Sequence, residues 1–193
     1  MGRRWISTAL LVLGAALLIA SLGQYGYMML RQHQLRQRWQ QLNSPATTHA
    51  PRAKTAALPE GGAPMRLIIP SIQLDDVVVR GTSYEDLLAA PGWLEGTPLP
   101  GQGNTVIAGH RDTFFRHVAD LRAGDAIVVR SGGEQYQYTV TGREIVKPSE
   151  TSVLANTAAP RLTLVTCYPT YWLGPAPDRL IVEAKLATSQ AVP

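Results

Sequence analysis

The 193-residue chain contains one cysteine, two phenylalanines and only 17% charged residues. The single cysteine, Cys167, excludes an intrachain disulfide, so it is buried, joined to another chain or kept for its reactivity. Acidic residues are scarce near the N-terminus: Glu60 is the only one before residue 65, and residues 1–64 carry a formal charge of +6 against −2 for the remainder. Because the remainder is slightly negative, it is a poor candidate for a nucleic-acid-binding surface.

Charged side chains are also missing from Trp5 to Leu30, a run of 26 residues. As a helix, this run would extend about 39 Å, enough to cross a hydrocarbon core about 30 Å thick. We therefore predict an uncleaved membrane anchor over residues 1–30. The alternative is a signal peptide cleaved near Ser21 and Gly23. Arginines flank both ends of the run, so the charges do not decide its orientation.

Residues 31–64 are expected to form a juxtamembrane helix followed by a linker. Leu35, Trp39 and Leu42 fall on one helical stripe among arginines and glutamines, which is typical either of a helix lying at the membrane interface or of a solvated stalk. Residues 43–64 contain four prolines separated mainly by Ala, Thr and Gly, a composition that predicts an extended linker.

Short apolar runs interrupted by Gly and Pro predict a mainly β domain over residues 65–187, followed by a tail at 188–193. So many short strands in one domain indicate a closed or nearly closed β-barrel. Two short helices are expected at Tyr84–Ala90 and Phe114–Leu121, each preceded by a capping Ser or Thr. The predicted strands are Leu67–Ile69, Val77–Arg80, Thr105–Ala108, Ala126–Arg130, Gln135–Val146, Leu162–Cys167 and Leu180–Ala184.

Three residues at the ends of predicted strands can together carry out nucleophilic chemistry. Cys167 ends one strand, His110 follows another after a glycine, and Arg179 enters the last. An imidazolium stabilises a thiolate and can then protonate an amine leaving group, while a guanidinium can stabilise a developing oxyanion. Taken singly, a buried cysteine, a hydrogen-bonded histidine and a surface arginine are ordinary structural residues.

The sequence around these three residues resembles the sortase family. Thr163–Cys167 matches the Thr-x-x-Thr-Cys strand of that family, Gly109-His110 matches its histidine motif, and Arg179 occupies the place of its arginine. Leu67–Ile72 and Pro100–Asn104 are similar to the family's opening strand and its approach to the histidine. The likeness covers about residues 65–186. Cys167-Tyr168-Pro169 together with an N-terminal anchor looks most like class D and Gram-negative-type sortases.

The resemblance implies an eight-stranded β-barrel and a transpeptidase that needs no cofactor or metal. Cys167 would be the nucleophile, His110 the general acid and base, Arg179 the ligand of the substrate carbonyl or oxyanion, and Thr166 a residue lining the substrate groove. A Leu-Pro-x-Thr-Gly-like sorting signal at the C-terminus of a substrate protein would be cleaved between Thr and Gly. The acyl group would pass to an amine on the cell envelope or on another protein, outside a bacterial plasma membrane that the chain spans once.

Other readings of the same residues are an L,D-transpeptidase, a papain-like peptidase and a non-catalytic envelope-binding domain. The first keeps its histidine close before the cysteine in a Ser-His-Gly-Cys segment, which this chain lacks. The second has its cysteine before its histidine, the reverse of the order here. Asp112 is expected either to orient His110 or to join a surface ion pair. A metal site formed by His110, His117 and Cys167 is the remaining, weaker alternative.

Overall fold

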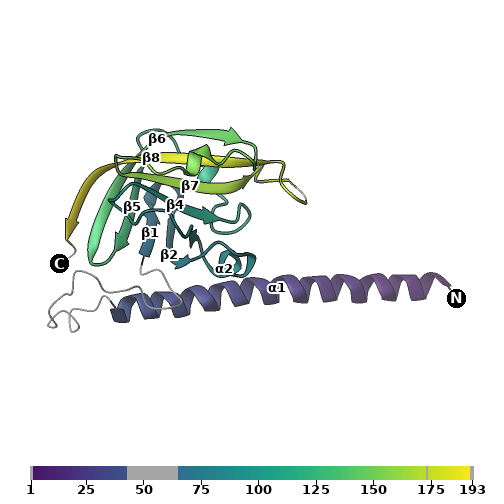
Figure 1. Ribbon diagram of the computed structural model, residues 1–193. Coiled ribbons are helices and arrows are strands. Elements are labelled where there is room, and N and C mark those ends of the chain that lie inside the picture. The colour runs from purple at the N-terminus through teal and green to yellow at the C-terminus, as the bar shows by residue number, and fades with distance from the viewer. Residues whose placement is uncertain (1, 43–64, 173, 192–193) are drawn as a thin grey trace.

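A long helix lies beneath a compact β-barrel in the computed structural model, which describes residues 2–42, 65–172 and 174–191 (Figure 1). The linker predicted at 43–64 lies outside the described residues. The helices are α1 (Gly2–Leu42) and α2 (Tyr84–Ala89), with short 3-10 turns η2 (Pro70–Ile72), η3 (Val118–Asp120) and η4 (Ser152–Leu154). The strands are β1 (Met65–Ile69), β2 (Leu74–Arg80), β3 (Gly92–Trp93), β4 (Asn104–Gly109), β5 (Ala126–Ser131), β6 (Glu134–Val146), β7 (Arg161–Tyr168) and β8 (Asp178–Ala191).

The eight strands close into a barrel in the order β1-β2-β3-β4-β7-β8-β6-β5. All seven predicted strands are present, and the mainly β prediction is confirmed. The eighth strand, β3, was not predicted because two residues show no periodicity. Closure depends on pairs that are distant in the sequence: β4 lies parallel to β7, and β1 lies antiparallel to β5.

Alternating side chains of the strands fill the interior of the barrel. Met65, Leu67 and Ile69 of β1 are fully buried, while the two residues between them are only half-buried. Tyr138 of β6 is also fully buried, and its hydroxyl accepts a hydrogen bond from the backbone N–H of Gly101 at 3.0 Å. This period of two is that of strands with one face against a core.

One of the two predicted short helices is confirmed and the other is wrong. Helix α2 begins after Ser83, whose hydroxyl accepts from the Asp86 N–H while the Asp86 carboxylate accepts from the Ser83 N–H, a complete capping box. The segment predicted as a helix at 114–121 forms consecutive turns and only the short η3. The backbone N–H of Phe115 donates to the carbonyl of His110, so this buried phenylalanine is held back against the end of β4.

Regular secondary structure extends to both ends of the described chain. The predicted tail at 188–193 is strand through Ala191, which pairs with Glu134 of β6. At the other end, α1 continues without a break from the apolar run into the predicted juxtamembrane helix. Its apolar side chains are exposed, and it is the one helix within the described residues that is long and apolar enough to cross a membrane.

Candidate active site

Cys167, His110 and Arg179 lie on three neighbouring strands at one end of the barrel. The Cα register pairs Cys167 directly with Arg179 across β7 and β8. His110 follows Gly109, which pairs with Thr166 in the parallel β4–β7 ladder. Neighbouring strands are about 4.8 Å apart, and opposed residues bring their Cβ atoms to about 5 Å. The tertiary structure therefore gathers the three residues, although 57 positions separate His110 from Cys167.

The thiol of Cys167 and the imidazole of His110 are both half-buried at this end of the barrel. Cys167 is free and half-buried, so it is partly shielded from solvent without belonging to the core. The Nε2 atom of His110 is buried and has no hydrogen-bond partner among the described residues. The ring of Tyr84 meets the imidazole edge-on, with 5.9 Å between ring centroids. A buried nitrogen without a partner is costly in a purely structural histidine, which favours a chemical role for this one.

The loop between β7 and β8 holds the guanidinium of Arg179. Its Nη1 donates to the carbonyls of Ala176, at 3.3 Å, and Asp178, at 2.9 Å. These bonds fix a half-buried cation at the start of β8, opposite the cysteine. A cation fixed in advance stabilises developing negative charge without reorganising during the reaction.

Thr166 does not offer its side chain to a groove in this structure. It is 2% exposed, and its hydroxyl donates to the carbonyl of Gly109 at 2.8 Å. The expected contact between Thr166 and a substrate is therefore replaced by a buried bond that joins β7 to β4. Thr166 directly precedes Cys167 on β7, and Gly109 directly precedes His110 on β4. The bond between them therefore helps to set the distance between Cys167 and His110.

The remaining sequence candidates lie outside this cluster. Asp112 is exposed, and its backbone carbonyl accepts from Arg116 at 3.0 Å. His117 is exposed too, with its Nδ1 3.2 Å from the Asp120 carboxylate. No group of three or more His, Cys, Asp and Glu side chains suited to a metal ion occurs among the described residues.

Sequence reasoning missed two residues that support the site. Arg111 donates from Nη2 to the carbonyls of Trp172, at 2.7 Å, and Gly174, at 2.8 Å, and so ties the end of β4 to the β7–β8 loop. Phe115 packs its ring on Gly109, where a Cβ atom would come within 2.6 Å of it. Adjacency to the Gly-His pair is the only signal in the sequence for either residue, because their partners are fixed by tertiary contacts.

Comparison with known proteins gives a consistent result. The family model described as the sortase domain matches residues 67–187. Sortase D of Bacillus subtilis is 31% identical over 145 residues, covering 74% of this chain and 73% of that protein. Among solved structures, sortase A of Listeria monocytogenes superposes with a TM-score of 0.63 at 26% identity, covering 68% of this chain and 92% of that one.

A sortase D5 transpeptidase of Clostridium perfringens has the same fold, with a TM-score of 0.64 at 24% identity, covering 84% of this chain and 99% of that one. The match to Sortase D supports the class D resemblance. The closed eight-stranded barrel, the strand-end cysteine and these likenesses agree, and they set aside the non-catalytic reading and the other peptidase families. The chain belongs to the sortase family, whose members are cysteine transpeptidases.

Proposed function

We propose that this chain is a membrane-anchored sortase that cleaves a Leu-Pro-x-Thr-Gly-like signal between Thr and Gly and transfers the acyl part to an amine. The observation that carries the proposal is the register of β4, β7 and β8, which brings His110, Cys167 and Arg179 to adjacent strand ends in a chain of this family. The substrate is a protein with such a signal at its C-terminus. The acceptor is an amine on the cell envelope or on another protein.

The reaction follows from these groups in two steps. His110 takes the thiol proton of Cys167, and the sulfur attacks the threonine carbonyl carbon. Arg179 stabilises the resulting oxyanion. The C–N bond to glycine breaks as the imidazolium returns its proton to the departing amine, which leaves a thioester on the sulfur. An incoming amine then attacks the thioester, loses a proton to His110 and releases the thiol, so that one amide bond replaces another.

Residues 1–30 are the proposed retained anchor, with residues 65–191 as the catalytic domain outside the membrane. The length of the apolar run and the weak cleavage region at Ser21 and Gly23 support retention, and helix α1 runs unbroken from Gly2 to Leu42 through both. Its polar end contacts the barrel through Gln32, which is 7% exposed. The outward side is proposed because that is where sorting substrates are found.

Intact-protein mass spectrometry tests the proposed chemistry. The full chain in detergent is incubated with a fluorogenic Leu-Pro-x-Thr-Gly peptide, and the Cys167→Ala variant serves as the control. We expect cleavage and an acyl adduct ending at threonine on the wild-type chain, and neither on the variant. Turnover by Cys167→Ala would refute the nucleophile assignment. If Cys167 can be alkylated but forms no adduct, the proposed signal is refuted, whereas the assignment as a transpeptidase stands.

A further inference from the structure

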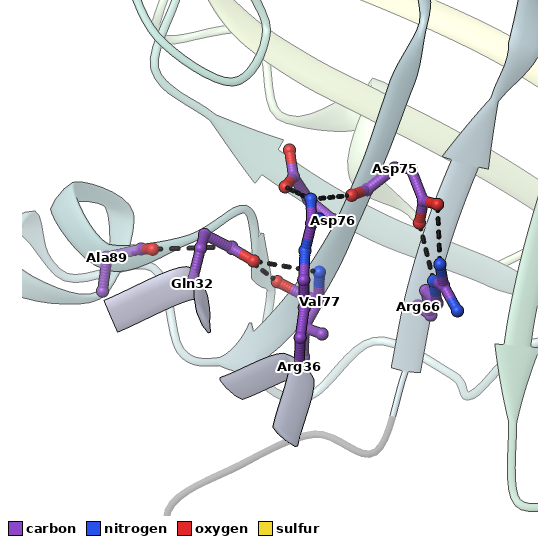
Figure 2. A network of polar contacts seen from close by, with 7 residues as sticks. All are labelled: Gln32, Arg36, Arg66, Asp75, Asp76, Val77 and Ala89. Carbon is purple, nitrogen blue, oxygen red and sulfur yellow. Dashed lines mark hydrogen bonds and ion pairs between the residues drawn. The ribbon is translucent and has the colours of Figure 1, made fainter. Parts of the chain in front are cut away.

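Strand β2 has an edge that its neighbour β3 leaves uncovered. On one side β2 pairs with β1 from Leu74 to Val78, but on the other side only Val79 and Arg80 pair with β3. Unpaired backbone groups along a strand edge need partners, and proteins normally cover such edges. Here the partner comes from the long helix α1, as Figure 2 shows.

The side-chain amide of Gln32 pairs with β2 in the way that a neighbouring strand would. Its Nε2 donates to the carbonyl of Val77 at 3.2 Å, and its Oε1 accepts from the Val77 N–H at 3.4 Å. One helical turn later, the guanidinium of Arg36 donates to the carbonyl of Asp75 and to the carboxylate of Asp76, the latter at 3.1 Å. Gln32 is 7% exposed, so this amide is buried in the contact.

The spacing of these contacts shows that the helix follows the strand edge. Four helical residues advance about 6 Å, and two strand residues advance about 6.6 Å. Positions 32 and 36 of α1 therefore match positions 77 and 75 of β2, whose edge groups point the same way. Because the advance of four helical residues is close to that of two strand residues, α1 can cover the edge of β2 that β3 is too short to reach.

Further contacts extend this docking over two helical turns. Gln32 also donates to the carbonyl of Ala89 at the end of α2, at 3.5 Å. Toward the end of α1, the guanidinium of Arg66 lies 5.2 Å from the centre of the Trp39 ring, and it forms two bonds of 2.6 Å with the Asp75 carboxylate. The contact involves β1, β2 and α2, so the barrel is held against one face of the helix.

The part of α1 that is hydrogen-bonded to the barrel begins directly after its apolar run. Leu30 ends the uncharged run and Gln32 is two residues later in the same unbroken helix. If residues 1–30 cross the bilayer, as proposed above, no flexible segment separates the membrane from the contact. The barrel must then lie at the bilayer surface, in an orientation that the helix sets.

The end of the barrel that carries the active site faces the membrane end of the helix. A groove of about 960 Å³ is lined on one side by Met28 and Met29 of α1 and on the other by Thr113 and Phe114, which follow His110. In Figure 1 the turn between β7 and β8 extends in the same direction as the N-terminal part of α1.

The turn between β7 and β8 exposes two aromatic side chains at this end. Tyr171 is 83% exposed and Trp172 is 48% exposed. Arg111 binds the carbonyl of Trp172, which keeps the turn beside the catalytic histidine. Exposed Tyr and Trp side chains are typical of the interface between a bilayer and water, because their rings are apolar and their edges are polar.

We propose that docking of α1 on the open edge of β2 holds the active-site end of the barrel against the bilayer, with Tyr171 and Trp172 in the phospholipid headgroup layer. Gln32 and Arg36 are the positioning residues. This inference rests on the proposed membrane anchoring. The thiol of Cys167 then reacts with chains presented at the membrane surface.

Depth-dependent fluorescence quenching tests the proposal on the full chain. In a Cys167→Ala background, Trp172→Cys is labelled with the fluorophore NBD, and the protein is reconstituted into vesicles of phosphatidylcholine and phosphatidylglycerol. The control label is placed at Ser189→Cys, an exposed position near the far end of β8. We expect a blue-shifted emission and strong quenching by headgroup-level nitroxide lipids at position 172, and neither at position 189.

The docking contact is tested in the same labelled protein. Gln32→Ala combined with Arg36→Ala should lower the quenching at position 172 to the level of the control and speed amide exchange at Val77. Gln40→Ala, an exposed glutamine of the same helix, should change neither. Equal quenching of the labels at positions 172 and 189, in protein with Gln32 and Arg36 intact, would overturn the proposal even if the double variant does not fold. Quenching at position 172 that persists in the folded double variant would overturn it as well. Failure of the unmodified chain to float with vesicles would instead refute the membrane anchoring itself.

Discussion

Replacing Gly109 by alanine probes how closely the core supports His110, the proposed catalytic histidine. A Cβ atom at this position would lie 2.6, 2.7 and 2.8 Å from three ring carbons of Phe115. Since carbon atoms in good contact are about 3.5–4.0 Å apart, the ring or the strand must move by about 1 Å. Phe115 is fully buried, so the ring has little space to yield.

The expected cost of Gly109→Ala has two parts. Overpacking of a core usually lowers the free energy of unfolding by about 1–3 kcal/mol. Because His110 follows directly, a shift of about 1 Å also misplaces its imidazole, and such errors can lower kcat about 100-fold. Thermal unfolding measures the first part, and kcat with the fluorogenic peptide measures the second.

Gly142→Ala is the matched control, because no atom lies within 4 Å of the Cβ position at that strand residue. Its activity should stay close to wild type. In a Phe115→Ala background, the Gly109→Ala change should cost much less stability than in the wild-type chain, since the clashing ring is gone. If Gly109→Ala proves as harmless as Gly142→Ala, the contact between Phe115 and the end of β4 does not constrain the site, and the reasoning is refuted.

Three further changes test the site and the barrel. Arg179→Lys should lower kcat by a factor of about 100 or more, because a point charge cannot reproduce the guanidinium fork; unchanged kcat would remove Arg179 from the chemistry. Thr166→Val should lower the free energy of unfolding by about 1–3 kcal/mol, because it removes the buried bond to the Gly109 carbonyl, and it should lower kcat more than it alters KM. Thr166→Ser keeps the hydroxyl and should keep both stability and kcat close to wild type. Equal behaviour of the two variants would contradict a positioning role. The hydrogen bond from Arg66 lowers the pKa of the Asp75 carboxyl below its ordinary value of 3.8, so the stability from this pair is present above that pH and is lost as the pH falls through the lowered pKa. The free energies of unfolding of wild type and Asp75→Asn should therefore converge as the pH is lowered. At higher pH they should differ by at most about 1 kcal/mol, since the carboxylate is 43% exposed. A difference that does not depend on pH would exclude the ion pair as its source.

Local patterns in the sequence were sufficient wherever a few neighbouring residues decide the structure. Short apolar runs interrupted by Gly and Pro predicted seven strands, and Ser83 with Asp86 three residues later forms the capping box that starts α2. The uncharged run predicted the long N-terminal helix. The strand-end positions of His110 and Cys167 were visible as well, because each stands at the end of a short strand-like run.

Long-range pairing decided the rest. The approach of His110 to Cys167 depends on the parallel β4–β7 register, which no local pattern specifies. The predicted helix at 114–121 fails because Phe115 is drawn into the core against Gly109, a contact stronger than the local helix preference.

The role of Gln32 shows the same limit most clearly. In the sequence it is one glutamine among several in a polar helix segment, with nothing to distinguish it from its neighbours. Only the folded barrel shows that β3 is too short to cover β2, and that the amide of Gln32 reaches the exposed edge. Side-chain pattern and capping act over a few residues, so the sequence reveals them directly. Strand register and docking join residues that are tens of positions apart, and they are decided only when the whole chain is packed.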